Sequence, residues 1–277
     1  MIRALLYLSF SFAGACLAAS AFAQKASPPA PIAIAKIAYV DDVVERQAGG
    51  VGWARVTEGM ELRIGDRLRT GRGGSARIDF PWMSVALAGS SRISVPSSLV
   101  LSTVLEEGRV EQTAPRGDMI KLVTAEARIR GEGRVVVRRE NGRTLVSALT
   151  GSFRIEAKGK LVSVAGGQGT IVASGRAPSP PVLLPAPPTA LDPGDDPLYV
   201  LPSEPVTMRF ASSARSHHVE ITTIDSNEVL LQRELGTGPA TVVIPWQGTF
   251  RWRVSARDKD GLEGLPSKEG LIAVVAK

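Results

Sequence analysis

The stretch that decides the fold runs from residue 59 to residue 110 and reads GMELRIGDRLRTGRGGSARIDFPWMSVALAGSSRISVPSSLVLSTVLEEGRV. Short apolar and polar runs alternate along it, and Gly, Pro or paired Ser interrupts them every few residues. Its apolar residues recur mostly at every second position, the period at which side chains return to one face of a strand. The clearest members are Val85, Leu87, Ile93, Val95, Leu99, Leu101, Val104 and Leu105. The stretch therefore predicts short strands joined by tight turns.

Three motifs follow one another in this stretch. Residues 65–71 read GDRLRTG, residues 73–80 read GGSARIDF, and residues 84–87 read SVAL. In this order they resemble the FecR domain, whose pattern is a G-D-x-hydrophobic-x-T-G turn, a G-x-A-x-hydrophobic strand and a small-residue turn before hydrophobic-x-hydrophobic. The resemblance covers roughly residues 37–173 and continues through residues 105–110, 122–127, 129–131, 146–153 and 164–168. It implies a β-rich extracytoplasmic domain.

The chain departs from the family pattern at two turns. It has Pro-Trp-Met-Ser at residues 81–84 where the family has an Asp-Gly-Ser-like turn, and Arg-Gly-Glu at residues 130–132 where the family has R-G-T. An aromatic on a turn is harder to explain as core than one in the middle of a strand. We therefore select Trp82, with its neighbours Arg72 and Arg77, as the candidate partner-binding residues. The alternative is that Trp82 folds back over the sheet.

The N-terminus has the pattern of a cleavable signal peptide, residues 1–23. Arg3 supplies the positive charge, residues 4–17 form an apolar stretch, and the small-x-small sequence of residues 21–23 predicts cleavage after Ala23. The apolar stretch is too short to remain as a membrane span. The chain is therefore expected in the periplasm, with no transmembrane span after signal-peptide removal. A lipoprotein site at Cys16 is the less favoured alternative.

The composition limits the expected partners. The only cysteine of the 277 residues is Cys16, so the exported chain has none to form a disulfide. There are 33 Lys and Arg against 27 Asp and Glu, and a mild positive excess favours anionic neighbours without specifying one. Nucleic acid is not expected, because no basic run is interleaved with aromatics. We expect an envelope protein, peptidoglycan or an anionic wall polymer as partner; the sequence leaves the oligomeric state open.

A proline-rich stretch divides the chain. Ten of its 19 prolines lie between residues 178 and 205, and proline cannot pair within a central strand. We expect a tether at residues 24–33, a FecR-like β-domain at 34–175, an extended linker at 176–197 and a small β-sandwich at 198–277. The last segment ends in an alternating strand with Phe250, Trp252 and Val254, an Asp/Gly turn and a final strand. It resembles immunoglobulin-like and fibronectin type III-like sandwiches.

The predicted fold class is all-β, with the N-terminal domain as a roll, sandwich or solenoid-like stack of many short strands. Turns are expected at residues 131–133, 140–142, 158–160 and 166–167, and the Asn141-Gly142 pair is the strongest hairpin signal. Trp53 is expected in the core, on a strand over residues 51–56.

The sequence offers no set of catalytic, cofactor or metal-binding residues. His217 and His218 are the only histidines, and as strand neighbours they are expected to face opposite ways and not to hold one metal together. No Gly-x-Ser-x-Gly motif or Cys/His couple is present. We therefore expect no enzyme and no cofactor.

Three functions remain open. The first is a non-enzymatic binding or scaffold protein of the bacterial envelope. The second follows from the resemblance, because FecR regulators sense a transporter through a periplasmic domain and signal across the membrane to a sigma-factor partner. This chain could be the extracytoplasmic part of such a relay. The third, ranked last for want of a site, is a hydrolase of wall polymer.

Overall fold

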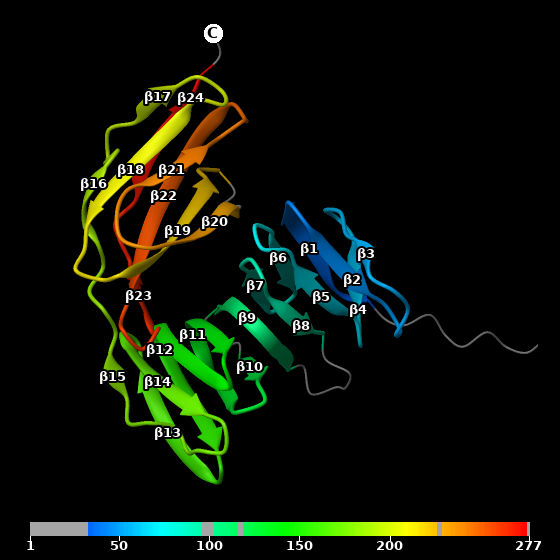
Figure 1. Cartoon of the computed structure of the whole chain (residues 1–277). Coiled ribbons are helices and arrows are strands. Elements are labelled where there is room, and N and C mark those ends of the chain that lie inside the picture. The colour runs from blue at the N-terminus through cyan, green and yellow to red at the C-terminus, as the bar shows by residue number, and fades with distance from the viewer. Residues whose placement is uncertain (1–32, 96–101, 116–118, 226–228, 276–277) are drawn as a thin grey trace, which may run out of the picture. The chain divides into compact units, whose positions relative to one another are not determined.

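The structure, a computed structural model, describes residues 33–95, 102–115, 119–225 and 229–275. Within these ranges every regular element is a strand, so the fold is all-β as predicted (Figure 1). The alternation seen in the sequence explains the burial: in the strand over residues 75–80, Ala76, Ile78 and Phe80 face the core. The predicted signal peptide, residues 1–23, and residues 24–32 of the predicted tether lie outside the described residues.

The first module comprises residues 33–183 and one sheet of 15 strands. Its strands are β1 (Ala33–Asp41), β2 (Val44–Gln47), β3 (Ala54–Arg55), β4 (Glu61–Arg63), β5 (Arg67–Thr70), β6 (Ser75–Phe80), β7 (Met83–Leu87), β8 (Arg92–Ser94), β9 (Thr103–Ala114), β10 (Ile120–Val123), β11 (Arg128–Glu140), β12 (Arg143–Ala157), β13 (Lys160–Ala165), β14 (Gln168–Ala173) and β15 (Val182–Leu183). The longest run of neighbours is β15-β14-β12-β11-β10-β9-β7-β6-β1-β4. β9 is the hub, because it also pairs with β8 and β11.

β11 and β12 are longer than predicted. The glycine-rich residues 131–133 do not form a turn; they continue the ladder, with Gly133 opposite Gly151. Both glycines have positive φ angles, 106° and 79°. The missing side chains let the two backbones approach closely, so the ladder continues through these glycines. The turn at Asn141-Gly142 is confirmed, with φ angles of 50° and 69° that suit a primed hairpin turn.

The second module comprises residues 189–275 in two sheets. Its strands are β16 (Thr189–Asp192), β17 (Leu198–Val200), β18 (Pro205–Ala211), β19 (Ser216–Thr223), β20 (Val229–Leu235), β21 (Ala240–Val243), β22 (Gly248–Arg257), β23 (Glu263–Pro266) and β24 (Gly270–Val274). One sheet has the order β16-β18-β21; the other has the order β17-β24-β22-β19-β20, with β23 paired to β22. A core cluster that contains Met208 of β18 and Trp252 of β22 joins the two sheets.

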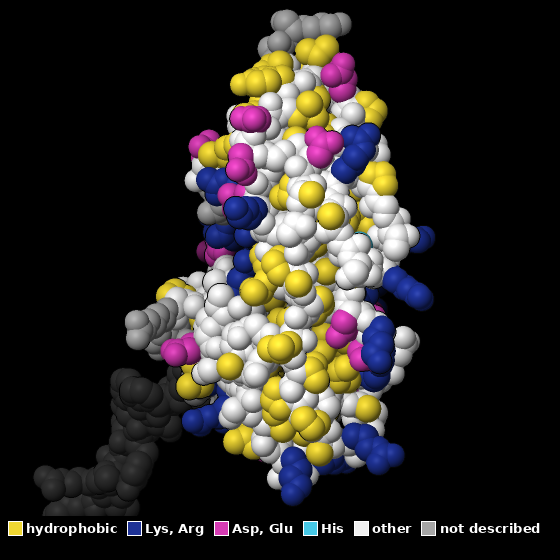
Figure 2. All heavy atoms as spheres, turned by 90° about the vertical axis from the view of Figure 1, so that its left-hand side faces the viewer, with side chains coloured by type: hydrophobic (Ala, Val, Ile, Leu, Met, Phe, Trp, Pro, Cys, Tyr) yellow, Lys and Arg dark blue, Asp and Glu magenta, His cyan; other side chains and the backbone are white. Residues whose placement is uncertain are grey.

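The proline-rich segment supplies only edge strands. β15 ends the large sheet, β16 ends the three-stranded sheet and β17 ends the six-stranded sheet, which is where strands that lack backbone donors can pair. The indole Nε1 of buried Trp252 donates to the carbonyl oxygen of Pro193 at 3.0 Å. This bond fixes the segment on the second module. Hydrophobic side chains, coloured yellow, run down the face shown in Figure 2. The exposed Leu183 of β15 and Tyr199 of β17 belong to the proline-rich segment.

Trp53 is a correction to the sequence interpretation. The strand there is only Ala54–Arg55, and Trp53 precedes it, half-buried and outside the core cluster. The guanidinium carbon of Arg69 lies 4.3 Å from the centroid of the indole ring. A cation–π contact therefore accounts for this aromatic instead of core packing.

Candidate functional site

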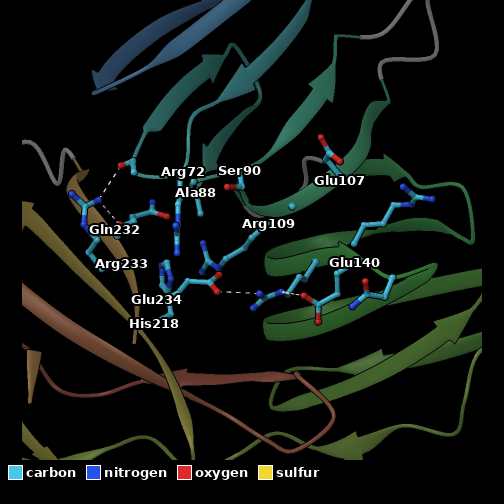
Figure 3. A pocket seen from close by; sticks show the side chains of 16 residues that line it. Arg72, Ala88, Ser90, Glu107, Arg109, Glu140, His218, Gln232, Arg233 and Glu234 are labelled. Atoms are coloured by element: carbon cyan, nitrogen blue, oxygen red, sulfur yellow. Dashed lines mark hydrogen bonds and ion pairs between the residues drawn. The ribbon is translucent and has the colours of Figure 1, made fainter. Parts of the chain in front are cut away.

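A polar cleft of about 860 Å³ lies where the two modules meet. All described residues belong to one compact unit, and Figure 3 shows side chains from both modules reaching into this cleft. The first module contributes the β5–β6 loop, the β7–β8 turn, the middle of β9 and the end of β11; the second contributes β19 and β20. The lining residues are Arg72, Gly73, Ala88, Gly89, Ser90, Glu107, Gly108, Arg109, Arg138, Arg139, Glu140, Asn141, His218, Gln232, Arg233 and Glu234.

The alternation along β19 explains why His218 faces the cleft. Val219 and Ile221 point into the second core, so His218 and Glu220 point to the other face of the sheet. His217, on the core side, packs against Phe210 with ring centroids 4.8 Å apart. The two histidines thus face opposite ways.

Below the cleft, a buried ion-pair network joins the modules. Arg109 of β9 is 2% exposed and donates through Nε and Nη2 to the two carboxylate oxygens of Glu263, at 2.9 Å and 2.7 Å. Its Nη2 also donates to Glu111 at 3.2 Å. The backbone N–H of Glu263 donates to the Ser147 hydroxyl at 3.0 Å. A bidentate pair of this kind fixes orientation as well as supplying attraction.

The network continues as an alternating chain of four arginines and four glutamates. Glu263 also pairs with Arg257 at 3.4 Å, Arg257 with Glu234 at 2.9 Å, and Glu234 with Arg138 at 3.0 Å. The full order is Arg134, Glu111, Arg109, Glu263, Arg257, Glu234, Arg138 and Glu140. It crosses between the modules at the Arg109–Glu263 and Arg138–Glu234 pairs. The network is electrically neutral.

The network keeps its carboxylates ionised. Burial alone would raise the pKa of Glu111, but Arg134 and Arg109 outweigh that effect and lower the pKa to about 2. In Glu263, burial is the largest single effect and would raise the pKa, but the attraction and hydrogen bond of Arg109 and the attraction of Arg257 and His218 together outweigh it and lower the pKa. In Glu234, burial is again outweighed, here by Arg257 and Arg138, and the pKa falls to about 2. At neutral pH these carboxylates accept hydrogen bonds and hold no proton to transfer.

His218 is neutral at physiological pH. Burial disfavours its charged form, and the nearby Arg109 adds to this, so the pKa falls to about 3. A neutral imidazole has one nitrogen that donates and one that accepts. The cleft therefore presents His218 as a hydrogen-bonding group without charge.

Several polar atoms at the cleft are buried without a partner in the described part of the chain. They are Nη1 of Arg109, both ring nitrogens of His218, and both the oxygen and nitrogen of the Gln232 amide. These residues are 2%, 3% and 4% exposed. Buried polar groups in folded proteins are nearly always hydrogen-bonded. Their gathering at one cleft makes it the candidate site of the molecule.

The structure separates the three residues predicted from the sequence. Arg72 is exposed and lines the cleft. Arg77, in the middle of β6, pairs with Asp79 at 2.9 Å. Trp82, in the turn after β6, is half-buried against the core, with its ring centroid 5.7 Å from that of Phe80. Arg72 and Trp82 thus lie at opposite ends of β6, and the partner-binding role of the three stays a prediction.

Arg109, Gln232 and Arg233 were not found from the sequence. Each lies on a strand where alternation reads as an ordinary polar face. The contacts that bring Arg109 and Arg233 to the cleft, with Glu263 and Gly73, span 154 and 160 positions of the chain. For His218 the sequence indicates only that it faces away from His217 on the same strand. β9 reads TVLEEGRVEQTA, so Arg109 is one of several charged residues on this strand and no local signal distinguishes it.

The described residues show neither a metal centre nor a membrane span. No three His, Cys, Asp or Glu side chains gather there in a way that could hold a metal ion. No helix with the length and apolarity to cross a membrane occurs in the same ranges.

Among known proteins, only solved structures show a similarity to this chain, and that similarity is partial. No family model matches the chain, and no curated protein matches it. Two solved structures, at 2.50 Å and 1.65 Å resolution, of a candidate anti-sigma factor from Parabacteroides distasonis ATCC 8503 are similar in part, each with 15% sequence identity and a TM-score of 0.37. The similar region covers 42% of this chain and 59% of theirs, so the chain spans about three fifths of the length of those proteins. A likeness of this size carries no argument about function.

Proposed function

We propose that the chain is a non-enzymatic, exported binding protein of the bacterial envelope that contacts another envelope protein or cell-wall glycan. The observation that carries this proposal is the cleft at which Arg109, His218 and Gln232 hold buried polar atoms without partners. Both modules build it, and sites between modules are common places for ligands. The carboxylates around it are held in ion pairs, which suits recognition better than proton transfer.

The family resemblances are part of the same proposal. The stretch that resembles the FecR domain falls on β1 to β14. The second module has two sheets with the inward aromatic Trp252 between them, an arrangement that supports the resemblance to immunoglobulin-like and fibronectin type III-like sandwiches. Export through a signal peptide of residues 1–23 remains the proposed route to the periplasm.

Affinity capture tests this function. Tagged protein is recovered from chemically cross-linked envelope, and co-purifying proteins are identified by mass spectrometry. Purified protein is sedimented in parallel with cell-wall sacculi. We expect either a stoichiometric envelope protein or co-sedimentation with sacculi. Absence of both would contradict the proposal.

The identity of the captured protein separates the binding function from the signalling alternative. Recovery of an outer-membrane transporter or a membrane-spanning regulator would favour the extracytoplasmic part of a relay. Co-sedimentation with sacculi and no protein partner would favour a wall-binding module. In both assays Trp82→Ala and Arg77→Ala test the prediction made from the sequence, with Arg55→Ala, an exposed arginine on β3, as the matched control.

A further inference from the structure

The unpartnered atoms of the cleft define the kind of ligand that would complete it. Nη1 of Arg109 can only donate a hydrogen bond, whereas the Gln232 amide and the neutral His218 ring can each donate and accept. All three side chains are less than 5% exposed and border the same hollow. A molecule seated there would need acceptors for the guanidinium and a mixture of donors and acceptors for the other two.

Two arginines, Arg72 and Arg233, give the cleft a positive charge that the protein offsets only in part, through the interaction of Asp41 with Arg233. In the described part of the chain, neither Arg72 nor Arg233 forms a direct ion pair with a carboxylate, and Asp41 acts on Arg233 only through a longer-range electrostatic attraction. Arg233 donates instead to the carbonyl oxygens of Gly73 and Gln232, at 2.9 Å and 3.0 Å. Figure 3 shows Arg72 reaching from the first module into the cleft, on the side where Gln232 and Arg233 lie.

The remaining charges of the cleft cancel within the protein. Arg138 pairs with Glu140 and Glu234, at 2.8 Å and 3.0 Å. Arg139 pairs with Glu126, which lies outside the cleft, at 2.9 Å. Glu107 pairs with Arg92, which also lies outside it, at 3.1 Å. The charge left for a ligand is therefore that of Arg72 and the part of the Arg233 charge that Asp41 does not offset.

The lining excludes other ligand classes. Its one aromatic ring is that of His218, which is buried, so a nucleobase finds little surface on which to stack. Ala88 is its one apolar residue, so a lipid chain would gain little by entering. Its volume, about 860 Å³, is within the range of small-molecule sites.

We propose that the cleft binds an oxyanion, the carboxylate or phosphate of a small hydrophilic molecule, between Arg72 and Arg233, with hydrogen bonds from Arg109, His218 and Gln232. Guanidinium groups match the planar or tetrahedral oxygens of such anions. Because its donors come from both modules, the ligand bridges them. This inference rests on the proposed binding function and names the ligand class of the same site.

Isothermal titration calorimetry of the purified full chain at pH 7.5 tests the inference. Citrate and inorganic phosphate are titrated separately, each against sodium chloride of equal ionic strength. We expect saturable binding of at least one oxyanion and none with chloride. Citrate alone would identify a carboxylate ligand, and phosphate alone a phosphate ligand; binding of neither would overturn the inference.

Substitutions of residues that line the cleft test whether the oxyanion binds there. Arg72 is exposed, so Arg72→Ala is expected to fold normally and to weaken binding at least about tenfold, the scale of one charge-assisted hydrogen bond. Gln232→Leu should weaken it as well, and the exposed Arg55→Ala should not. Binding that is unchanged in Arg72→Ala and in a folded Gln232→Leu would overturn the site.

The two proposals can fail separately. Each variant also enters the capture and sedimentation assays. If the wild-type chain retains its envelope partner or its sacculus binding but takes up neither oxyanion, only the ligand class is wrong. If oxyanion binding is found and no macromolecular partner is recovered, the envelope-contact function is wrong and the cleft stands.

Discussion

At the scale of single residues, the decisive feature is a buried arginine whose partners come from another part of the chain. Burying two charges costs free energy that their attraction repays only with good geometry and full hydrogen bonding. Arg109 and Glu263 have the good geometry in their bidentate pair, but the hydrogen bonding is incomplete, since Nη1 of Arg109 has no partner among the described residues. The pair therefore specifies how the modules dock more than it adds net stability.

Removing one partner should be costly. Glu263→Ala leaves the guanidinium groups of Arg109 and Arg257 buried with fewer carboxylates, and we expect a loss of about 3–5 kcal/mol in the free energy of unfolding. Urea denaturation measures it. The matched control is Arg209→Ala, which breaks an exposed pair with Asp192 in which both side chains are 65% exposed and should cost less than about 1 kcal/mol. Equal losses in the two variants would contradict this view.

His218 gives the stability a dependence on pH. Its pKa is about 3 in the folded chain against an ordinary value of 6.5, so the unfolded chain binds the proton first. The stability it contributes is complete above pH 6.5 and is lost as the pH falls toward 3. The groups that face it are Arg109, Arg257, Glu111 and Glu263.

Between pH 7.5 and pH 5.5 this effect should remove about 1 kcal/mol of stability, before the carboxylates of the network begin to titrate. Urea denaturation at both pH values measures it in the wild type and in His218→Gln, which cannot titrate. We expect the variant to lose less stability than the wild type over this interval. An equal loss would show that other groups cause it.

At the scale of elements, the sequence predicted strands better than their ends. Period-two alternation located β6 and β7, and positive-φ turn chemistry located the hairpin at Asn141-Gly142. The same glycine signal failed at residues 131–133, because a glycine also serves where two paired backbones approach closely. Which use applies depends on the partner strand, and the partner of Gly133 is Gly151, 18 positions away. Local sequence does not contain that information.

Substitutions at two glycines, Gly151 in β12 and Gly159 in the turn before β13, can distinguish the cost of steric crowding from the cost of backbone strain. Both Gly151 and Gly159 have positive φ, 79° and 69°. A Cβ on Gly151 would lie 1.9 Å from the carbonyl oxygen of Glu132, whereas one on Gly159 meets nothing within 4 Å. We expect Gly159→Ala to cost about 1–2 kcal/mol, the strain of the left-handed conformation alone, and Gly151→Ala at least twice as much. Thermal unfolding of both variants checks this, and equal costs would contradict the crowding.

At the scale of the whole molecule, two hydrophobic cores are joined through charge. The first cluster contains Ile37 and Phe153, and the second contains Met208 and Trp252. The surfaces that meet between them carry the ion-pair network and the cleft. The sequence predicted two β-rich parts on either side of the proline-rich stretch, but it gave no sign that they dock. Docking depends on polar residues that pair across 154 positions, as Arg109 and Glu263 do, and such pairs leave no periodic pattern.

This arrangement makes a prediction about cooperativity. In native-state hydrogen exchange followed by mass spectrometry, amides of β11 and of β22 should open with the same free energy, since separating the modules would expose the buried charges of both. Glu263→Ala removes one of the two crossings of the network, so we expect the two strands to exchange with different free energies. Arg209→Ala should leave them equal, because its pair with Asp192 lies within the second module.

Different free energies in the wild type would mean that the modules unfold independently and that the network does not couple them. In that case an oxyanion that bridges Arg72 and Arg233 should raise both free energies toward a common value, because a ligand held by two modules stabilises only the state in which they are docked.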